Sequence, residues 1–106
     1  MYAIKEKTKQ LNQVKTKTYC RNVKFSNAEF EVEAGTTGFR GDVPREKSAR
    51  GYVSLLCKNG DFFFRPVSDE SGRPVGIGIA CCGDGALMTL TDSLIFAVNA
   101  LTDFYS

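Results

Sequence analysis

The hydrophobic positions of the chain follow two different periods, which separate its middle from its C-terminal end. In Phe30-Glu31-Val32-Glu33 every second side chain shares one face, the alternation of a half-buried strand. Runs of this kind predict strands at 20–25, 29–34, 52–57, 62–66 and 75–80. From Leu87 onward the apolar residues recur every three or four positions, which is typical of an amphipathic helix. The stripe of this helix consists of Leu87, Leu90, Leu94, Ala97, Leu101 and Phe104.

Turn-forming residues connect the predicted segments. Ser26-Asn27-Ala28 predicts a hairpin between the first two strands. Asn59-Gly60 predicts another between 52–57 and 62–66, because both residues tolerate the positive φ of a tight turn. Asp84 is expected to cap the helix at its N-terminus. The pattern therefore predicts an α+β fold, in which an antiparallel sheet of about five strands packs against a C-terminal amphipathic helix.

Residues 1–17 depart from both periods, because their apolar residues are sparse. We interpret them as a basic N-terminal arm or helix, followed by a single α+β domain at 18–106. Seven basic residues and Glu6 give residues 1–24 a charge of +6, so the rest of the chain carries −4 of the net +2. This basic segment is either a solvated terminus or a surface that meets polyanions.

Composition narrows the chemistry. At 106 residues the chain has room for one domain and one core. It has no histidine, which removes histidine-based catalysis and most zinc sites, and its four cysteines form no C-x-x-C pair. We therefore predict no catalytic residues, no metal and no cofactor. No apolar run approaches the ~20 residues of a membrane span. The lysine-rich first residues lack the apolar core of a signal peptide. We therefore expect a cytoplasmic protein whose four cysteines are reduced thiols.

The segment Gly35–Gly51 is a long polar loop that combines glycines, hydroxyl groups, one aromatic ring and four cations. Free backbone amides and arginine side chains suit phosphate oxygens, and the ring of Phe39 suits the face of a base. The same composition is also that of an ordinary surface loop. Loops this long in a compact domain are usually either functional or disordered.

Two stretches resemble a known family. Phe30 through Asp42, continued by Arg50-Gly-Tyr-Val-Ser-Leu55, resembles a strand end with Thr-Thr-Gly plus an aromatic residue, a Gly-Asp-rich loop and an arginine that opens the next strand. Cys82-Gly-Asp84 and the helix up to Leu101 resemble the turn and closing helix of the same family. This pattern is similar to that of the phage-borne Thoeris anti-defence sponge proteins.

The resemblance implies a phage anti-defence protein that binds a cyclic nucleotide immune signal, of cyclic ADP-ribose type or a cyclic oligonucleotide, and sequesters it without turnover. It implies action in the host bacterial cytoplasm and a homodimer or higher homo-oligomer that holds ligand between subunits. We expect neither DNA nor a membrane as a partner. An alternative is a protein-binding inhibitor of a bacterial defence complex. The residues expected to bind ligand are Thr36, Thr37, Phe39, Arg40 and Arg50, with the turn at Gly83 and Asp84 nearby.

Overall fold

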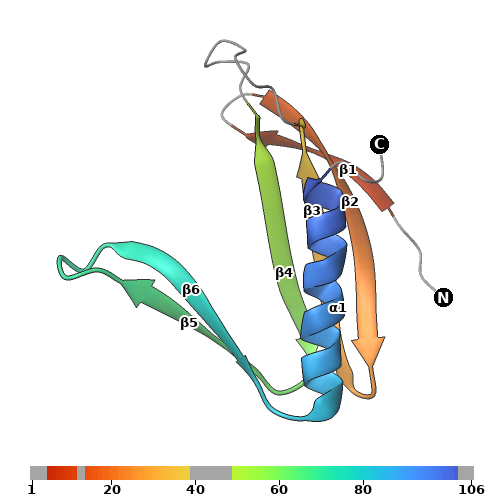
Figure 1. Cartoon of the computed structure of the whole chain (residues 1–106), viewed down its shortest axis with the longest axis vertical. Helices are drawn as coiled ribbons and strands as arrows, with labels where there is room; N and C mark the ends of the chain where they lie inside the picture. Colours follow the sequence, from red (N-terminus) through yellow and green to blue (C-terminus); the bar gives the residue numbers. More distant parts are fainter. Residues whose placement is uncertain (1–4, 12–13, 39–48, 103–106) are drawn as a thin grey trace.

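The computed structural model describes residues 5–11, 14–38 and 49–102, and these form two antiparallel sheets and one helix (Figure 1). The larger sheet has the order β1-β2-β3-β4, and the smaller sheet is a hairpin of β5 and β6. The elements are β1 (Lys5–Leu11), β2 (Val14–Phe25), β3 (Ala28–Thr36), β4 (Gly51–Asn59), β5 (Phe62–Ser68), β6 (Pro74–Cys81) and α1 (Asp84–Leu101). The predicted α+β fold with a C-terminal helix is confirmed.

The core lies between α1 and the middle of the larger sheet. Alternate residues of β2 and β3 point toward the helix, and Val23, Phe30 and Val32 are fully buried there. Phe96 of α1 completes this cluster and is 1% exposed. The helix lies mainly over β3 and β2 and makes few contacts with β4. Among the described residues, no helix has the length and apolar composition needed to cross a membrane.

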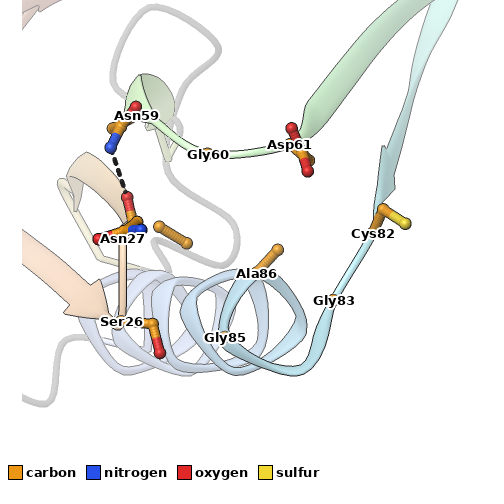
Figure 2. A pocket seen from close by; sticks show the side chains of 10 residues that line it. Ser26, Asn27, Asn59, Gly60, Asp61, Cys82, Gly83, Gly85 and Ala86 are labelled. Carbon is orange, nitrogen blue, oxygen red and sulfur yellow. Dashed lines mark hydrogen bonds between the residues drawn. The ribbon is translucent and has the colours of Figure 1, made fainter.

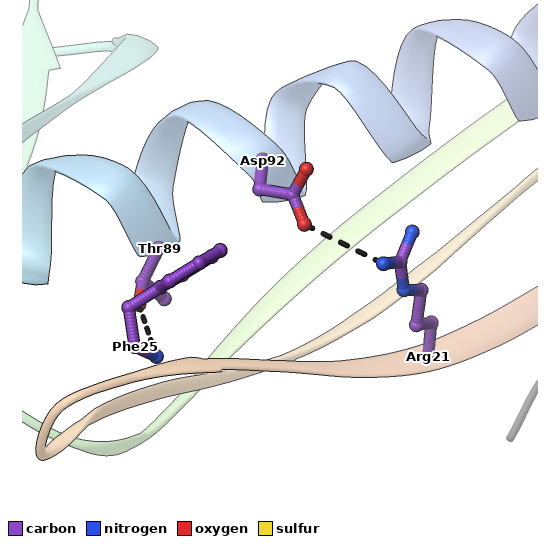
Figure 3. A network of polar contacts seen from close by, with 4 residues as sticks. All are labelled: Arg21, Phe25, Thr89 and Asp92. Carbon is purple, nitrogen blue, oxygen red and sulfur yellow. Dashed lines mark hydrogen bonds and ion pairs between the residues drawn. The ribbon is translucent and has the colours of Figure 1, made fainter. Parts of the chain in front are cut away.

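Two polar contacts fasten α1 to β2 (Figure 3). The Thr89 hydroxyl accepts a hydrogen bond from the Phe25 amide at 3.2 Å and donates one to the Ala28 carbonyl at 3.0 Å. It therefore satisfies both ends of the turn between β2 and β3. One turn further along the helix, Asp92 forms an ion pair with Arg21 of β2 at 3.5 Å. These contacts fix the position of the helix along the strand.

The predicted N-terminal arm or helix is replaced by strands. Lys5–Leu11 form β1, which pairs with β2 from Lys5 opposite Cys20 to Leu11 opposite Val14. β2 itself starts at Val14, within the segment that we assigned to the arm. An edge strand is held by main-chain pairing and needs no apolar alternation, and lysines are frequent on such edges because they discourage further pairing.

The Asn59-Gly60 segment turns the chain, but the predicted hairpin between β4 and β5 does not form. β5 pairs with β6 in a separate sheet, while β4 pairs with β3. Gly60 has φ +120°, and a Cβ there would lie 2.8 Å from the ring of Phe62 and 3.1 Å from the Ala28 Cα. This close approach directs Phe62 onto the core, where its ring centroid lies 4.2 Å from that of Phe30. The packing of Phe62 therefore takes β5 away from β4.

Two expectations about α1 are also corrected. Gly83, with φ 107°, occupies the N-cap position, and no side chain in the described residues caps the helix. Asp84 is instead the first helical residue, where its charge faces the positive end of the helix dipole. The predicted stripe forms the buried face only in part: Ala97 is buried and Leu90 packs against the core, but Leu87 and Leu94 are 55% and 45% exposed. The buried residues are Ala86, Thr89, Ser93, Phe96, Ala97 and Ala100.

Candidate functional site

The ends of the Gly35–Gly51 loop are tied together where β3 ends and β4 begins. The Thr36 hydroxyl and the Thr37 amide both donate to the Arg50 carbonyl, at 2.8 and 3.1 Å. In return, the Arg50 amide donates to the Thr37 hydroxyl at 2.8 Å. The Gly38 amide donates to the Thr36 hydroxyl at 3.0 Å, which closes the group. We call Thr36, Thr37, Gly38 and Arg50 the loop base.

The loop base holds Arg50 by its main chain. Both the amide and the carbonyl of Arg50 are occupied by the two threonines. The residue is half-buried, in a segment whose conformation is fixed from two sides. The sheet thus holds the main chain of Arg50 in place, and binding residues are often positioned in this way on loops that a rigid scaffold supports.

A buried carboxylate lies three residues before Thr36 in β3, on the sheet face opposite α1. Glu33 is 8% exposed, and the Thr18 hydroxyl donates to its Oε2 at 2.7 Å. Two residues further along β3, Gly35 allows β2 to approach very closely, because a Cβ at this position would overlap the Lys17 carbonyl oxygen. Any other residue would force the strands apart and open the region around Glu33.

The sequence did not reveal the burial of Glu33. The alternation correctly placed Glu33 on the face opposite Phe30 and Val32, but it did not show that this carboxylate is buried. The signal in the sequence was the alternation of the hydroxyl residues Thr16 and Thr18. In the structure both residues are fully buried in β2. Hydroxyls at every second position of a strand can satisfy a carboxylate from a neighbouring strand.

The opposite end of the larger sheet carries a polar pocket of about 380 Å³ (Figure 2). The turn between β2 and β3, the segment from Asn59 to Asp61 and the start of α1 surround it. The Asn59 side chain donates to the Asn27 carbonyl at 2.8 Å, and the Cys82 amide donates to the Asp61 carbonyl at 3.1 Å. Gly83 lines this pocket as well. These contacts hold the two turns and the helix start together.

The structure therefore brings together some of the predicted site residues and separates others. Thr36, Thr37 and Arg50 meet at the loop base, whereas Phe39 and Arg40 lie outside the described residues. Gly83 and Asp84 are not nearby: they begin α1 beside the Ala28 end of β3, and Thr36 is the last residue of that strand. The length of the strand, about 26 Å at ~3.3 Å per residue, lies between them. One chain cannot place both groups around one small ligand.

The cysteines and acidic residues form no metal cluster within the part of the chain that the structure describes. All four cysteines lie in this part, and each is a free thiol. Cys20 is buried, whereas Cys82 is exposed at the pocket beside Gly83. The cysteines therefore differ in environment, and we assign them no shared role.

Comparison of the chain with protein-family models, with curated proteins and with solved structures finds no significant match.

Proposed function

We propose that the protein binds a phosphate-bearing cyclic nucleotide at the loop base and sequesters it without turnover. The observation that carries this proposal is the double attachment of the Arg50 main chain to Thr36 and Thr37. An arginine whose backbone is fixed loses less conformational freedom on binding, and its guanidinium presents a planar fork that matches phosphate geometry. A sponge needs such affinity and no catalytic group.

The ligand class comes from the sequence. The loop between Gly38 and Arg50 supplies further arginines and an aromatic ring, which suit a phosphate and a base, respectively. The resemblance of Phe30–Asp42 and Cys82–Leu101 to the Thoeris anti-defence sponge proteins adds the type of signal, a cyclic ADP-ribose or a cyclic oligonucleotide. Under this proposal the chain is a phage protein that acts in the host bacterial cytoplasm as a homodimer or larger assembly.

A ligand panel tests this function. Purified protein is titrated calorimetrically with cyclic ADP-ribose isomers and cyclic oligonucleotides, and bound ligand is then recovered after heat denaturation and identified by mass spectrometry. We expect one class to bind and to return intact. A cleaved product would indicate an enzyme, and the absence of binding across the panel would contradict the proposal.

Arg50 variants locate the site. Arg50→Ala preserves the main-chain attachments and removes the guanidinium, so affinity should fall about 10- to 100-fold, the cost of a charged hydrogen-bond partner. Arg50→Lys keeps the charge but loses the fork, and we expect an intermediate loss. Arg73→Ala is the matched control, because Arg73 is exposed near the tip of the β5–β6 hairpin. Equal effects of Arg50→Ala and Arg73→Ala would place the site elsewhere.

A second candidate function is inhibition of a bacterial defence complex through protein binding. The observation in its favour is the side of the β5–β6 hairpin that carries Phe63, which is 67% exposed beside Arg65 and the flat backbone at Gly78. An exposed ring next to an arginine is typical of a protein-binding anchor. Phe63→Asp should abolish anti-defence activity in infected cells under this reading, and should leave it unchanged under the nucleotide-binding reading.

A further inference from the structure

The surface of α1 that faces away from the sheet is apolar along most of its length. Leu87, Met88, Leu94, Ile95 and Val98 are each about half exposed on this outer ridge. An exposed helix face normally carries charged residues, yet Asp84 and Asp92 are the only charged residues of α1. Asp92 is turned to the flank of the helix, where it pairs with Arg21 of β2. The outer ridge therefore has the composition of a buried surface.

The outer ridge also has the shape of a surface on which a second helix can pack. Thr91, Leu94, Ile95 and Val98 surround a shallow depression of about 290 Å³, which Asn99 also lines. Their spacing of three, four and seven residues is that of the four side chains that form a hole for a side chain of a second helix. Leu87, at the other end of the ridge, supplies a side chain of the size that enters such a hole. One helix thus carries both complementary elements.

The extent of exposed surface agrees with a missing partner. The chain has an accessible surface of 7377 Å², compared with about 5,900 Å² for a folded monomer of this mass. Its radius of gyration is 15.4 Å, compared with about 13 Å for a compact domain of this length. The excess surface of ~1,500 Å² is within the about 1,000–2,500 Å² that one subunit buries in an obligate homodimer.

The β5–β6 hairpin projects away from α1 and the larger sheet (Figure 1). Phe62 and Phe64 pack on Phe30, which fixes the base of the hairpin on the side of the sheet that carries α1. Ile77, opposite Pro66 in the register, continues the same hairpin face and is 63% exposed. An isolated two-stranded hairpin is marginally stable in water, so this face gains most from a covering layer.

We propose that the outer ridge of α1 is a two-fold interface with α1 of a second copy of this chain. A two-fold axis brings the same patch of both subunits together, so the interface must be complementary to itself. A ridge that holds both the hole and the side chains that fill it, without unpaired charge, meets this condition.

The oligomeric state tests this interface without any nucleotide, so its outcome is separate from that of the proposed ligand binding. Wild-type protein should sediment at twice its chain mass of 11.7 kDa. Leu94→Asp places a charge in the interface and should raise the dissociation constant by at least two orders of magnitude. Leu56→Asp is the matched control, because Leu56 is 51% exposed on the sheet face opposite α1. It should leave the dimer unchanged.

A second measurement on the wild type keeps the test decisive if Leu94→Asp does not fold. A mixture of isotope-labelled and unlabelled protein is studied by isotope-filtered NMR, which detects contacts between copies alone. We expect intermolecular contacts among the methyl groups of Leu94, Ile95 and Val98. A monomer at all concentrations, or intermolecular contacts confined to Leu56 or to the β5–β6 hairpin, would overturn the proposal.

Discussion

The two long faces of α1 differ in the size of their apolar side chains. The larger ones lie mainly on the outer face, whereas in most helices they face the core. The face against the sheet carries mostly small side chains and two hydroxyls, with Phe96 and the half-buried Leu90 as its large residues. The outer ridge carries leucine, isoleucine, methionine and valine. Small residues let the helix approach the sheet closely, and Thr89 then reaches the main chain of the turn between β2 and β3. The comparison teaches that the largest apolar residues of a helix do not always face the core of the same subunit, because they can also form an interface with a second subunit.

Adjacent residues on the two faces give the sharpest contrast. Phe96→Ala should lower the free energy of unfolding by about 3–5 kcal/mol, because it leaves a cavity in the centre of the core. Ile95→Ala, one residue earlier and 53% exposed, should cost little in the separated subunit. Urea unfolding at low protein concentration measures both. Equal losses would show that the two faces are not distinct.

Thr89 tests whether polar contacts or apolar area hold the inner face. Thr89→Val keeps the shape of the side chain but leaves the Phe25 amide and the Ala28 carbonyl without their partner. We expect a loss of about 1–3 kcal/mol in the free energy of unfolding, the cost of buried polar groups that lose a hydrogen bond. Hydrogen exchange of the Phe25 amide should rise in parallel. An unchanged exchange rate would contradict the role assigned to Thr89.

The ion pair on the flank of the helix should matter less. Arg21 and Asp92 are partly exposed and 3.5 Å apart, so Asp92→Asn should cost about 1 kcal/mol or less. The difference from wild type should shrink as salt is added, because exposed charges are screened. Chemical denaturation with urea at two salt concentrations measures this dependence. A large effect that is independent of salt would indicate that Asp92 has a further role.

The smallest effect is expected at the tip of the hairpin. Asp69 accepts from the Ser71 hydroxyl at 2.7 Å and from the Arg73 amide at 3.1 Å, and these bonds hold its pKa below the ordinary value of 3.8. Because the folded pKa is lowered, the stabilising contribution is fully present above pH 3.8 and is lost as the pH falls through the lower folded value. NMR shifts of the Ser71 and Arg73 amides follow this loss, and Asp69→Asn should lack the transition.

The sequence predicted those elements whose signal is local. Alternation located β3 and β6, and the change of period located α1, because burial on one face imposes these patterns residue by residue. It did not predict β1, since an edge strand draws its stability from main-chain pairing with β2. It also misassigned the partner of β5, because turn residues such as Asn59-Gly60 describe a change of direction and not the strand that follows.

The candidate site was predictable in part for the same reason. The attachment of both loop ends to the sheet follows from the positions of Gly35 and Gly51 between two strands, and the structure shows it at Thr36, Thr37 and Arg50. Whether Gly83 lies near the loop base depends on the end of β3 at which the helix begins. No local sequence pattern contains this information. The burial of Glu33 likewise depends on the close approach of β2 at Gly35.

The loop base affects how well the protein tolerates substitutions and changes of length in the loop. Four hydrogen bonds between Thr36, Thr37, Gly38 and Arg50 close the segment between them into a ring that the sheet supports from outside. Residues within such a ring can be exchanged, lengthened or shortened at modest entropic cost, because its ends stay fixed. Changes of length or sequence between Gly38 and Arg50 are therefore expected to alter the free energy of unfolding of the core only slightly.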